Sequence, residues 1–337
     1  MHLTKEQSRK IQMMRGIAIV AVILTHCIPF TPQEMYIGPF VHFCVPTFLF
    51  LSGLLTSPFR TDIGGLYKKR LSRVLFPYIL WSVIYTACEN SWSTFLFDLL
   101  TGQCCSIYYY ILVYIQLVLL TPLIAKIVRS RFFWLLYLIS PVTILITYGM
   151  AWNDHYPPYP FNLNLFFVWI TIYSFGMRIR MKSETDTLPK SGKRTRILLL
   201  FAGLFLTAVA IWLDYRESLF WQAAGNGLLA GTQAKLSAFA ASMLIANLFY
   251  LWFSSEKEKK GIRRAVAYIP GSVLKELGDT SFGIYLSHQL LLHWFSYCSF
   301  WPETSIPVHL LLVLVFSYLA VKMLHWITGR FGRIIGV

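Results

Sequence analysis

The stretch MMRGIAIVAVILTHCIPF, residues 13–30, decides the fold class. It is an apolar run long enough for a membrane-spanning helix, with a cation, Arg15, near its start and an imidazole, His26, inside it. Eleven residues turn a helix by three turns and about 20°, so both side chains are expected on one face, about 16 Å apart along the axis. His26 is then expected about halfway through the hydrocarbon core, where an ionisable group is costly and indicates a functional site. The structural alternative is a histidine hydrogen-bonded to a neighbouring helix.

The composition of the chain is that of a membrane protein. Of its 337 residues, 56% are hydrophobic and 13% are charged, whereas a soluble domain carries about 25% charged residues. The net charge of +15 would suggest a nucleic-acid partner in a soluble chain, but here the distribution of the charge explains it. The first apolar run is too long for a signal peptide, and further apolar runs follow it. We therefore expect an all-α membrane protein whose partner is the lipid bilayer and not nucleic acid.

Ten apolar segments are long enough to cross a bilayer. If the N-terminus is cytoplasmic and the segments alternate in direction, 28 of the 30 Lys and Arg residues fall in cytoplasmic loops and tails or near the cytoplasmic ends of the segments. The positive-inside rule therefore predicts about ten transmembrane helices, an even number, with both termini cytoplasmic. We place the segments at 13–31, 37–56, 74–90, 107–127, 132–149, 161–179, 197–213, 232–253, 280–299 and 306–327.

A basic cluster precedes the third segment, in LYKKRLSRVLFPY, residues 66–78. Arg70 and Arg73 are three residues apart and are expected on one helix face. Two guanidinium groups on one face form a fork that suits phosphate oxygens. Basic residues before a span also serve topology and bind lipid head groups, and we prefer that interpretation for Lys68 and Lys69. For the two arginines the pattern leaves both interpretations open.

A second polar cluster opens the ninth segment, in ELGDTSFGIYLSHQLLLH, residues 276–293. Asp279 is expected near the inner surface, either as a site residue or as a helix cap. His288 is nine residues further along, about 13 Å deeper. That depth is close to the one expected for His26, so the two histidines could meet in the bundle. A buried core histidine is the equally weighted alternative for His288.

A general base needs a partner that orients it. The membrane part of the first segment contains no acidic residue, so a partner for His26 must come from another span or from a backbone carbonyl. Ser52 and Tyr285 are candidates for supporting roles because they are polar groups in apolar runs. His42, at the outer end of the second segment, could face an acceptor, although we favour a structural role for it.

The remaining ligand-type residues predict no further site. No spacing of His, Cys, Asp and Glu predicts a metal site. Six cysteines are no disulfide framework. The sequence leaves open whether Cys104 or Cys105 forms a disulfide.

Four stretches, in order along the chain, match the motifs of one family. MMRGIAIVAVILTH (13–26) resembles its first helix with an Arg and an essential His, and VPTFLFLSGLL (45–55) resembles its second helix. KKRLSRVLFPYILW (68–81) is similar to a basic RxxR motif followed by Pro-Tyr, and LGDTSFGIYLSHQLLL (277–292) to a late motif that ends in His. YSFGMRIR (173–180) also fits a Phe–Gly turn. Together they resemble the acyltransferase-3 family of integral membrane acyltransferases.

The resemblance implies a function. Members O-acetylate surface polysaccharides, lipopolysaccharide, enterobacterial common antigen and related glycans. The chain is therefore expected to move an acyl group, by preference acetyl, from cytosolic acyl-CoA to a sugar hydroxyl of a cell-surface or lipid-linked glycan. We expect a single acyltransferase domain over residues 1–337, without an appended soluble domain, in the cytoplasmic membrane of a bacterium. No tightly bound cofactor is implied, because acetyl-CoA is a donor substrate.

The resemblance also implies roles for individual residues. Arg15, Arg70 and Arg73 would hold the phosphates of acyl-CoA at the inner face. His26 would act as general base on the acceptor hydroxyl, or would carry the acyl group itself. Apart from the resemblance, Ser52, Asp279, Tyr285 and His288 are candidates for supporting roles because of their places in the chain.

Two alternatives stand beside this function. The first is a transporter or channel in which His26 and His288 line a path through the membrane. The second is an enzyme of the same family that acts on an acceptor other than a glycan.

Overall fold

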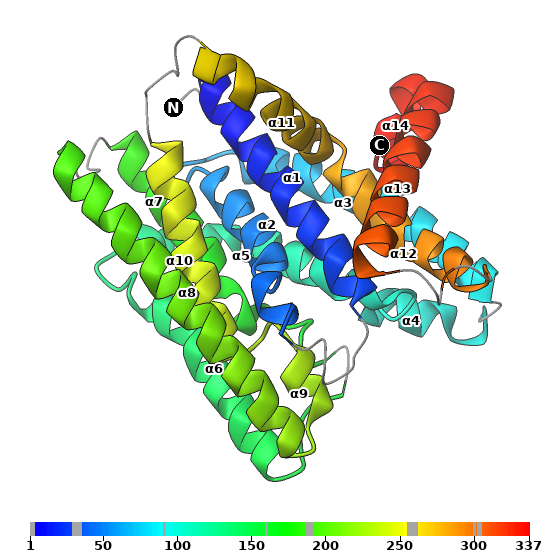
Figure 1. The fold of residues 1–337 in the computed structure, drawn as a ribbon, viewed down its shortest axis with the longest axis horizontal. Helices are drawn as coiled ribbons and strands as arrows, with labels where there is room; N and C mark the ends of the chain where they lie inside the picture. The colour runs from blue at the N-terminus through cyan, green and yellow to red at the C-terminus, as the bar shows by residue number, and fades with distance from the viewer. Residues whose placement is uncertain are drawn as a thin grey trace. The chain divides into compact units, whose positions relative to one another are not determined.

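A computed structural model of the chain describes residues 4–28, 36–89, 92–158, 161–185, 192–254, 262–298, 301 and 305–337. These residues form α-helices joined by short 3-10 turns and contain no β-strand, so the predicted all-α class is confirmed (Figure 1). The helices are α1 (Lys5–Cys27), α2 (Cys44–Leu54), α3 (Ile63–Glu89), α4 (Phe95–Thr101), α5 (Tyr109–Arg129), α6 (Leu135–Trp152), α7 (Ile170–Glu184), α8 (Lys193–Ala223), α9 (Gly227–Gly231), α10 (Leu236–Phe253), α11 (Ile262–Asp279), α12 (Ser281–Ser296), α13 (Ile306–Thr328) and α14 (Gly332–Ile335).

Each of the ten predicted segments overlaps a helix of 11 residues or more, and the class of membrane protein is confirmed. Helix α11, with 18 residues, lies in a predicted loop between two segments. Within the described ranges, seven helical stretches are long and apolar enough to cross a membrane. Helices α2, α7 and α12 have 11, 15 and 16 residues and are shorter than those stretches. The total of ten spans and the cytoplasmic position of the termini stay predictions.

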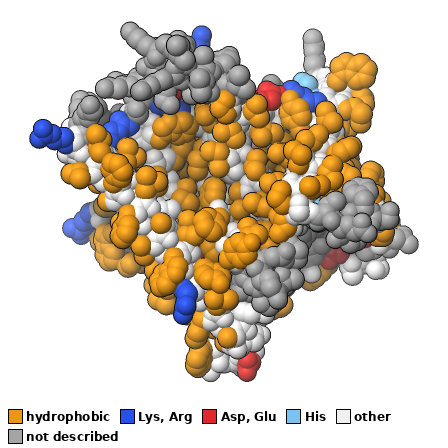
Figure 2. Space-filling model, viewed as in Figure 1, with side chains coloured by type: hydrophobic (Ala, Val, Ile, Leu, Met, Phe, Trp, Pro, Cys, Tyr) orange, Lys and Arg blue, Asp and Glu red, His pale blue; other side chains and the backbone are white. Residues whose placement is uncertain are grey.

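The outer surfaces of the helices are apolar. Leu198, Phe201 and Phe205 are exposed along α8, and Leu311 and Trp326 along α13. Figure 2 shows hydrophobic side chains over most of the visible face, with few Lys and Arg. Exposing so much apolar surface to water would be unfavourable in free energy, whereas lipid tails solvate it.

The start of α1 differs from the prediction. The helix begins at Lys5, eight residues before the predicted segment. Thr4 and Gln7 form a capping box, in which each side chain accepts a hydrogen bond from the backbone N–H of the other residue. This box satisfies N–H groups that would otherwise lack partners, so a polar first turn joins the apolar helix.

Two compact units divide the chain, each built from two stretches. The first comprises Met1–Leu51 and Lys182–Ser281. In this unit α1 packs along α11 with backbones in close approach. A Cβ on Gly16 would lie 2.0 Å from the carbonyl oxygen of Leu274, and a Cβ on Gly278 would lie 1.8 Å from that of Gln12. These glycines therefore set the contact between the two helices.

The second unit comprises Ser52–Met181 and Phe282–Val337. Its core includes tyrosines from α3, the turn before α5, and α12. The rings of Tyr78 and Tyr85 lie edge-on to that of Tyr108, with centroids 5.0 and 5.8 Å away. Cys104 and Cys105 are buried with free thiols, so neither forms the disulfide that the sequence left open.

Candidate functional site

His26 and Arg15 lie on one uninterrupted helix, α1, as predicted. The expected place of His26 in the interior of a helix that continues to residue 31 is wrong. The helix ends at Cys27, where Ile28 adopts an extended backbone, and His26 is exposed in the last turn. The reason is Pro29, because the residue before a proline is disfavoured in the helical region. His26 therefore lies at a helix end.

Arg15 is half-buried near the middle of α1. Its Nη1 lies 3.4 Å from Oε1 of Gln12, one turn earlier. With about 1.5 Å of rise per residue, the Cα atoms of Arg15 and His26 are about 16 Å apart along the axis.

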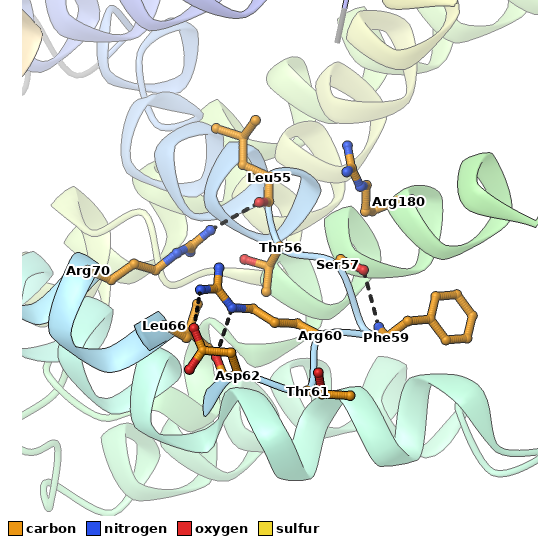
Figure 3. A pocket seen from close by; sticks show the side chains of 10 residues that line it. All are labelled: Leu55, Thr56, Ser57, Phe59, Arg60, Thr61, Asp62, Leu66, Arg70 and Arg180. Carbon is orange, nitrogen blue, oxygen red and sulfur yellow. Dashed lines mark hydrogen bonds and ion pairs between the residues drawn. The ribbon is translucent and has the colours of Figure 1, made fainter. Parts of the chain in front are cut away.

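Arg70 binds the C-terminal end of α2. Its Nη1 donates to Oγ of Ser52 at 3.0 Å. Its Nη2 donates to the carbonyl oxygen of Leu55 at 3.2 Å, a bond drawn in Figure 3. A cation is favoured at a helix C-terminus, where carbonyl groups lack partners within the helix. Two residues that the sequence singled out separately, Arg70 and Ser52, are thus in direct contact. Ser52 serves to orient the guanidinium group.

A cavity of about 450 Å³ lies beside this contact. Its lining includes Arg70 from α3, Arg60 from the α2–α3 loop and Arg180 from α7 (Figure 3). Arg60 is held by Asp62, with Nε 2.9 Å from the Asp62 carbonyl oxygen and Nη2 3.4 Å from its carboxylate. Three guanidinium groups against one carboxylate leave the lining positive. This chemistry suits a ligand with several phosphate or carboxylate groups.

Asp62 also fixes the start of α3. Its Oδ1 accepts a hydrogen bond of 2.7 Å from the backbone N–H of Gly65. That bond, with the added effect of Arg60, holds the pKa of Asp62 below its ordinary value. The carboxylate therefore caps the helix and orients Arg60 at neutral pH.

The sequence did not single out Arg60 or Arg180. Arg180 belongs to the YSFGMRIR stretch. Arg178, in the same stretch, donates through Nη1 to the carbonyl oxygen of Val128 at 2.6 Å. Arg60 is one of several basic residues that the charge pattern assigned to topology. The predicted partner of Arg70, Arg73, is exposed on α3 and does not line the cavity.

The residues of the late motif lie in or beside α12. His288 is fully buried, and its Nδ1 lies 2.8 Å from the carbonyl oxygen of Tyr285 in its own helix. The hydroxyl of Tyr285 donates to the carbonyl oxygen of Ile107. Both side chains thus bond to backbone carbonyls. His26 belongs to the first unit and His288 to the second, so their meeting stays a prediction.

Asp279 is the last residue of α11 and is exposed. Its carboxylate pairs with Lys275, one turn earlier. Since α12 begins at Ser281, the predicted alternative that Asp279 caps the ninth segment is wrong. Its role as a site residue stays a prediction.

Comparison with models of protein families identifies the family of this chain. A family model of the acyltransferase-3 type, described as an acyltransferase domain, matches residues 9–331. The chain belongs to the acyltransferase-3 family. It is therefore a multi-pass membrane acyltransferase, and the match includes the helices that carry Arg15, His26, Arg70 and His288. No curated protein and no solved structure matches the chain in the corresponding comparisons.

Proposed function

We propose that this acyltransferase-3 protein moves an acyl group, by preference acetyl, from acyl-CoA to a hydroxyl of a cell-surface or lipid-linked glycan. The observation that carries the proposal is the cavity lined by Arg60, Arg70 and Arg180 in a chain of this family. The membrane would be the cytoplasmic membrane of a bacterium. The acceptor class rests on the resemblance of the chain's motifs to glycan-modifying members.

The donor side of the proposal follows from charge. Acyl-CoA carries a pyrophosphate and a further phosphate, so it needs several cations in one place. Bidentate guanidinium–phosphate contacts supply both energy and orientation. Arg70, already positioned by Ser52 and Leu55, would offer its remaining edge to a phosphate, and Arg60 and Arg180 would add two more contacts. Arg15 and Arg73, which the motifs of the family also indicate, would be further phosphate-binding residues.

The transfer step is assigned to His26. A neutral imidazole can take the proton of a hydroxyl that attacks the thioester, or it can attack the thioester and carry the acyl group. The first route holds donor and acceptor together and lowers the entropic part of the barrier, whereas the second divides the transfer into two easier steps. His288, Tyr285, Asp279 and Ser52 would support the site through the packing and hydrogen bonds described above.

The experiment that tests the donor is acetyl-CoA binding to the purified protein in detergent. Arg70→Ala/Arg73→Ala and Arg180→Ala are each expected to weaken binding by tenfold or more. Arg15→Ala tests whether Arg15, in α1, also contributes to acetyl-CoA binding. Arg131→Ala is the matched control, because Arg131 is an exposed arginine of the same unit that does not line the cavity.

Binding that is lost in the cavity variants and kept in the control would establish the donor site. Absence of acetyl-CoA binding to folded wild-type protein would refute the donor assignment. In that case transport through the membrane, with histidines along the path, would become the first alternative.

A further inference from the structure

A buried ionisable cluster lies in the first unit. Asp214, in α8, has no exposed surface. Its Oδ2 lies 2.7 Å from Nδ1 of His42, and its Oδ1 lies 2.8 Å from Nζ of Lys235. Lys235 is equally buried and also donates to the carbonyl oxygen of Ala230 at 2.7 Å. We call His42, Asp214 and Lys235 the buried triad.

The charges of the buried triad balance when His42 is neutral. Lys235 and Asp214 form an ion pair. Oγ of Ser237 lies 3.3 Å from Oδ1 of Asp214, but the same hydroxyl makes a shorter hydrogen bond to the carboxylate of Glu217. Because the carboxylate accepts from its neighbours, Nδ1 of His42 carries the proton in this arrangement. The lone pair is then on Nε2, the other ring nitrogen.

A contribution to stability is a weak explanation for the presence of the buried triad. Asp214 lies in a helical stretch apolar enough to span a membrane, where a carboxylate is costly. Apolar residues can often replace a buried ion pair with little loss of stability. A carboxylate that orients a neutral imidazole is, in contrast, the usual support of a general base.

The position of His42 fits that role. A Cβ on Gly38 would lie 3.2 Å from Nε2 of His42, so the glycine leaves room at this edge of the ring. His42 is two residues before Cys44, whose thiol donates to Oε1 of Gln233 at 3.9 Å.

We propose that His42, oriented by Asp214, is a catalytic base that takes the proton of the acceptor hydroxyl. This inference rests on the proposed function. His26 first attacks the thioester and carries the acyl group, so the C–S bond breaks and the thiolate departs. The acceptor hydroxyl then gives its proton to Nε2 of His42, the hydroxyl oxygen forms the ester bond to the acyl carbon, and the bond between that carbon and His26 breaks. The proton passes from His42 to the thiolate, which becomes the free thiol, and both histidines return to their neutral forms.

The test compares His42→Gln with the wild type. The amide N–H of glutamine can keep the hydrogen bond to Asp214, but the amide cannot take up a proton. Membranes that contain either protein receive [14C]acetyl-CoA, and the label in the lipid-linked and surface glycan fraction is measured. We expect the initial rate to fall by about 100-fold or more. The amount of membrane-inserted protein and its affinity for acetyl-CoA are expected to stay within about twofold.

A second variant tests access to Nε2 and leaves the buried triad unchanged. Gly38→Ala places a methyl group against the ring edge, so the transfer rate is expected to fall severalfold. Gly64→Ala, which meets no atom within 4 Å, is the matched control and is expected to transfer at the wild-type rate.

The outcomes separate this inference from the proposed function. If the wild type transfers the label and His42→Gln transfers it at the same rate, the proposed function stands and the assignment of His42 is overturned. If His42→Gln does not accumulate in the membrane, an unchanged rate in Gly38→Ala would overturn it instead. Wild-type membranes that transfer no label would overturn the proposed function, and the assignment of His42 with it.

Discussion

The contact between Arg70 and Ser52 allows a quantitative prediction about stability and donor binding. Arg70 makes two well-formed hydrogen bonds to the end of α2, at 3.0 Å to the Ser52 hydroxyl and 3.2 Å to the Leu55 carbonyl. Hydrogen bonds of a charged donor contribute about 1.5–3 kcal/mol each when buried. Since Arg70 is half-buried, solvent screening lowers this to about 1–1.5 kcal/mol for each bond. Arg70→Ala is therefore expected to lower the free energy of unfolding by about 2–3 kcal/mol.

Ser52→Ala isolates one of these bonds. It removes the hydroxyl acceptor but leaves the charge of Arg70 and the carbonyl contact to Leu55. We expect a loss of about 1 kcal/mol in the free energy of unfolding and a donor affinity reduced by less than tenfold. In Arg70→Ala the affinity falls further, because the phosphate contact is lost as well. Arg70→Lys keeps a charge but loses the planar fork, so its affinity is expected to lie between the two.

The assay is a double-mutant cycle. Unfolding of the wild type, both single variants and Ser52→Ala/Arg70→Ala is followed by tryptophan fluorescence in one detergent, and acetyl-CoA affinity is measured on the same samples. A coupling energy of about 1 kcal/mol between the two positions is expected. A coupling energy near zero would refute the reasoning that Ser52 positions the guanidinium group.

Three further predictions concern α1 and the start of α3. His26→Ala is expected to abolish acyl transfer while the protein stays in the membrane; full activity measured with labelled acetyl-CoA would contradict the assigned role. Gly278→Ala would force a methyl group to within 1.8 Å of the Gln12 carbonyl oxygen and is expected to destabilise the first unit by about 3 kcal/mol or more, measured by thermal unfolding against Gly64→Ala. The pKa of Asp62 is lowered in the folded protein, so its contribution to stability is present above about pH 4 and is lost as the pH falls through the folded value. Asp62→Asn keeps the helix cap and should remove this acid-side dependence, and an unchanged pH profile of unfolding would argue against Asp62 as its source.

Local sequence determined what could be predicted about the helices. Apolar length and the distribution of Lys and Arg predicted the class, and the spacing of Arg15 and His26 predicted one helix for both. The ends of α1 were missed although the sequence contains their signals, the capping pair Thr4 and Gln7 and the helix-ending Pro29. Hydropathy averages over a window, whereas a helix end depends on one or two hydrogen bonds.

The sites were harder to predict because they join distant parts of the chain. The cavity combines Arg70 with Arg180, 110 positions later in the sequence, and no local pattern relates the two. His42 and Asp214 are 172 positions apart. In the sequence His42 looked structural, because the carboxylate that orients it comes from a helix elsewhere in the chain. Lys235 and Arg216 are the two basic residues outside the loops and tails that the charge pattern predicts to be cytoplasmic, and that exception was the available signal.

The close contact of α1 with α11 fixes the positions of Arg15 and His26 along the helix axis. If α1 slid by one residue along α11, it would also turn by about 100°. A residue with a side chain would then take the place of Gly16 against the backbone of Leu274. No space exists for that side chain, so α1 has one permitted register. Arg15 and His26 are therefore held in a fixed register, about 16 Å apart along the helix axis. In the proposed function, a donor bound at Arg15 would have to span this distance to reach His26, because α1 cannot shift along α11.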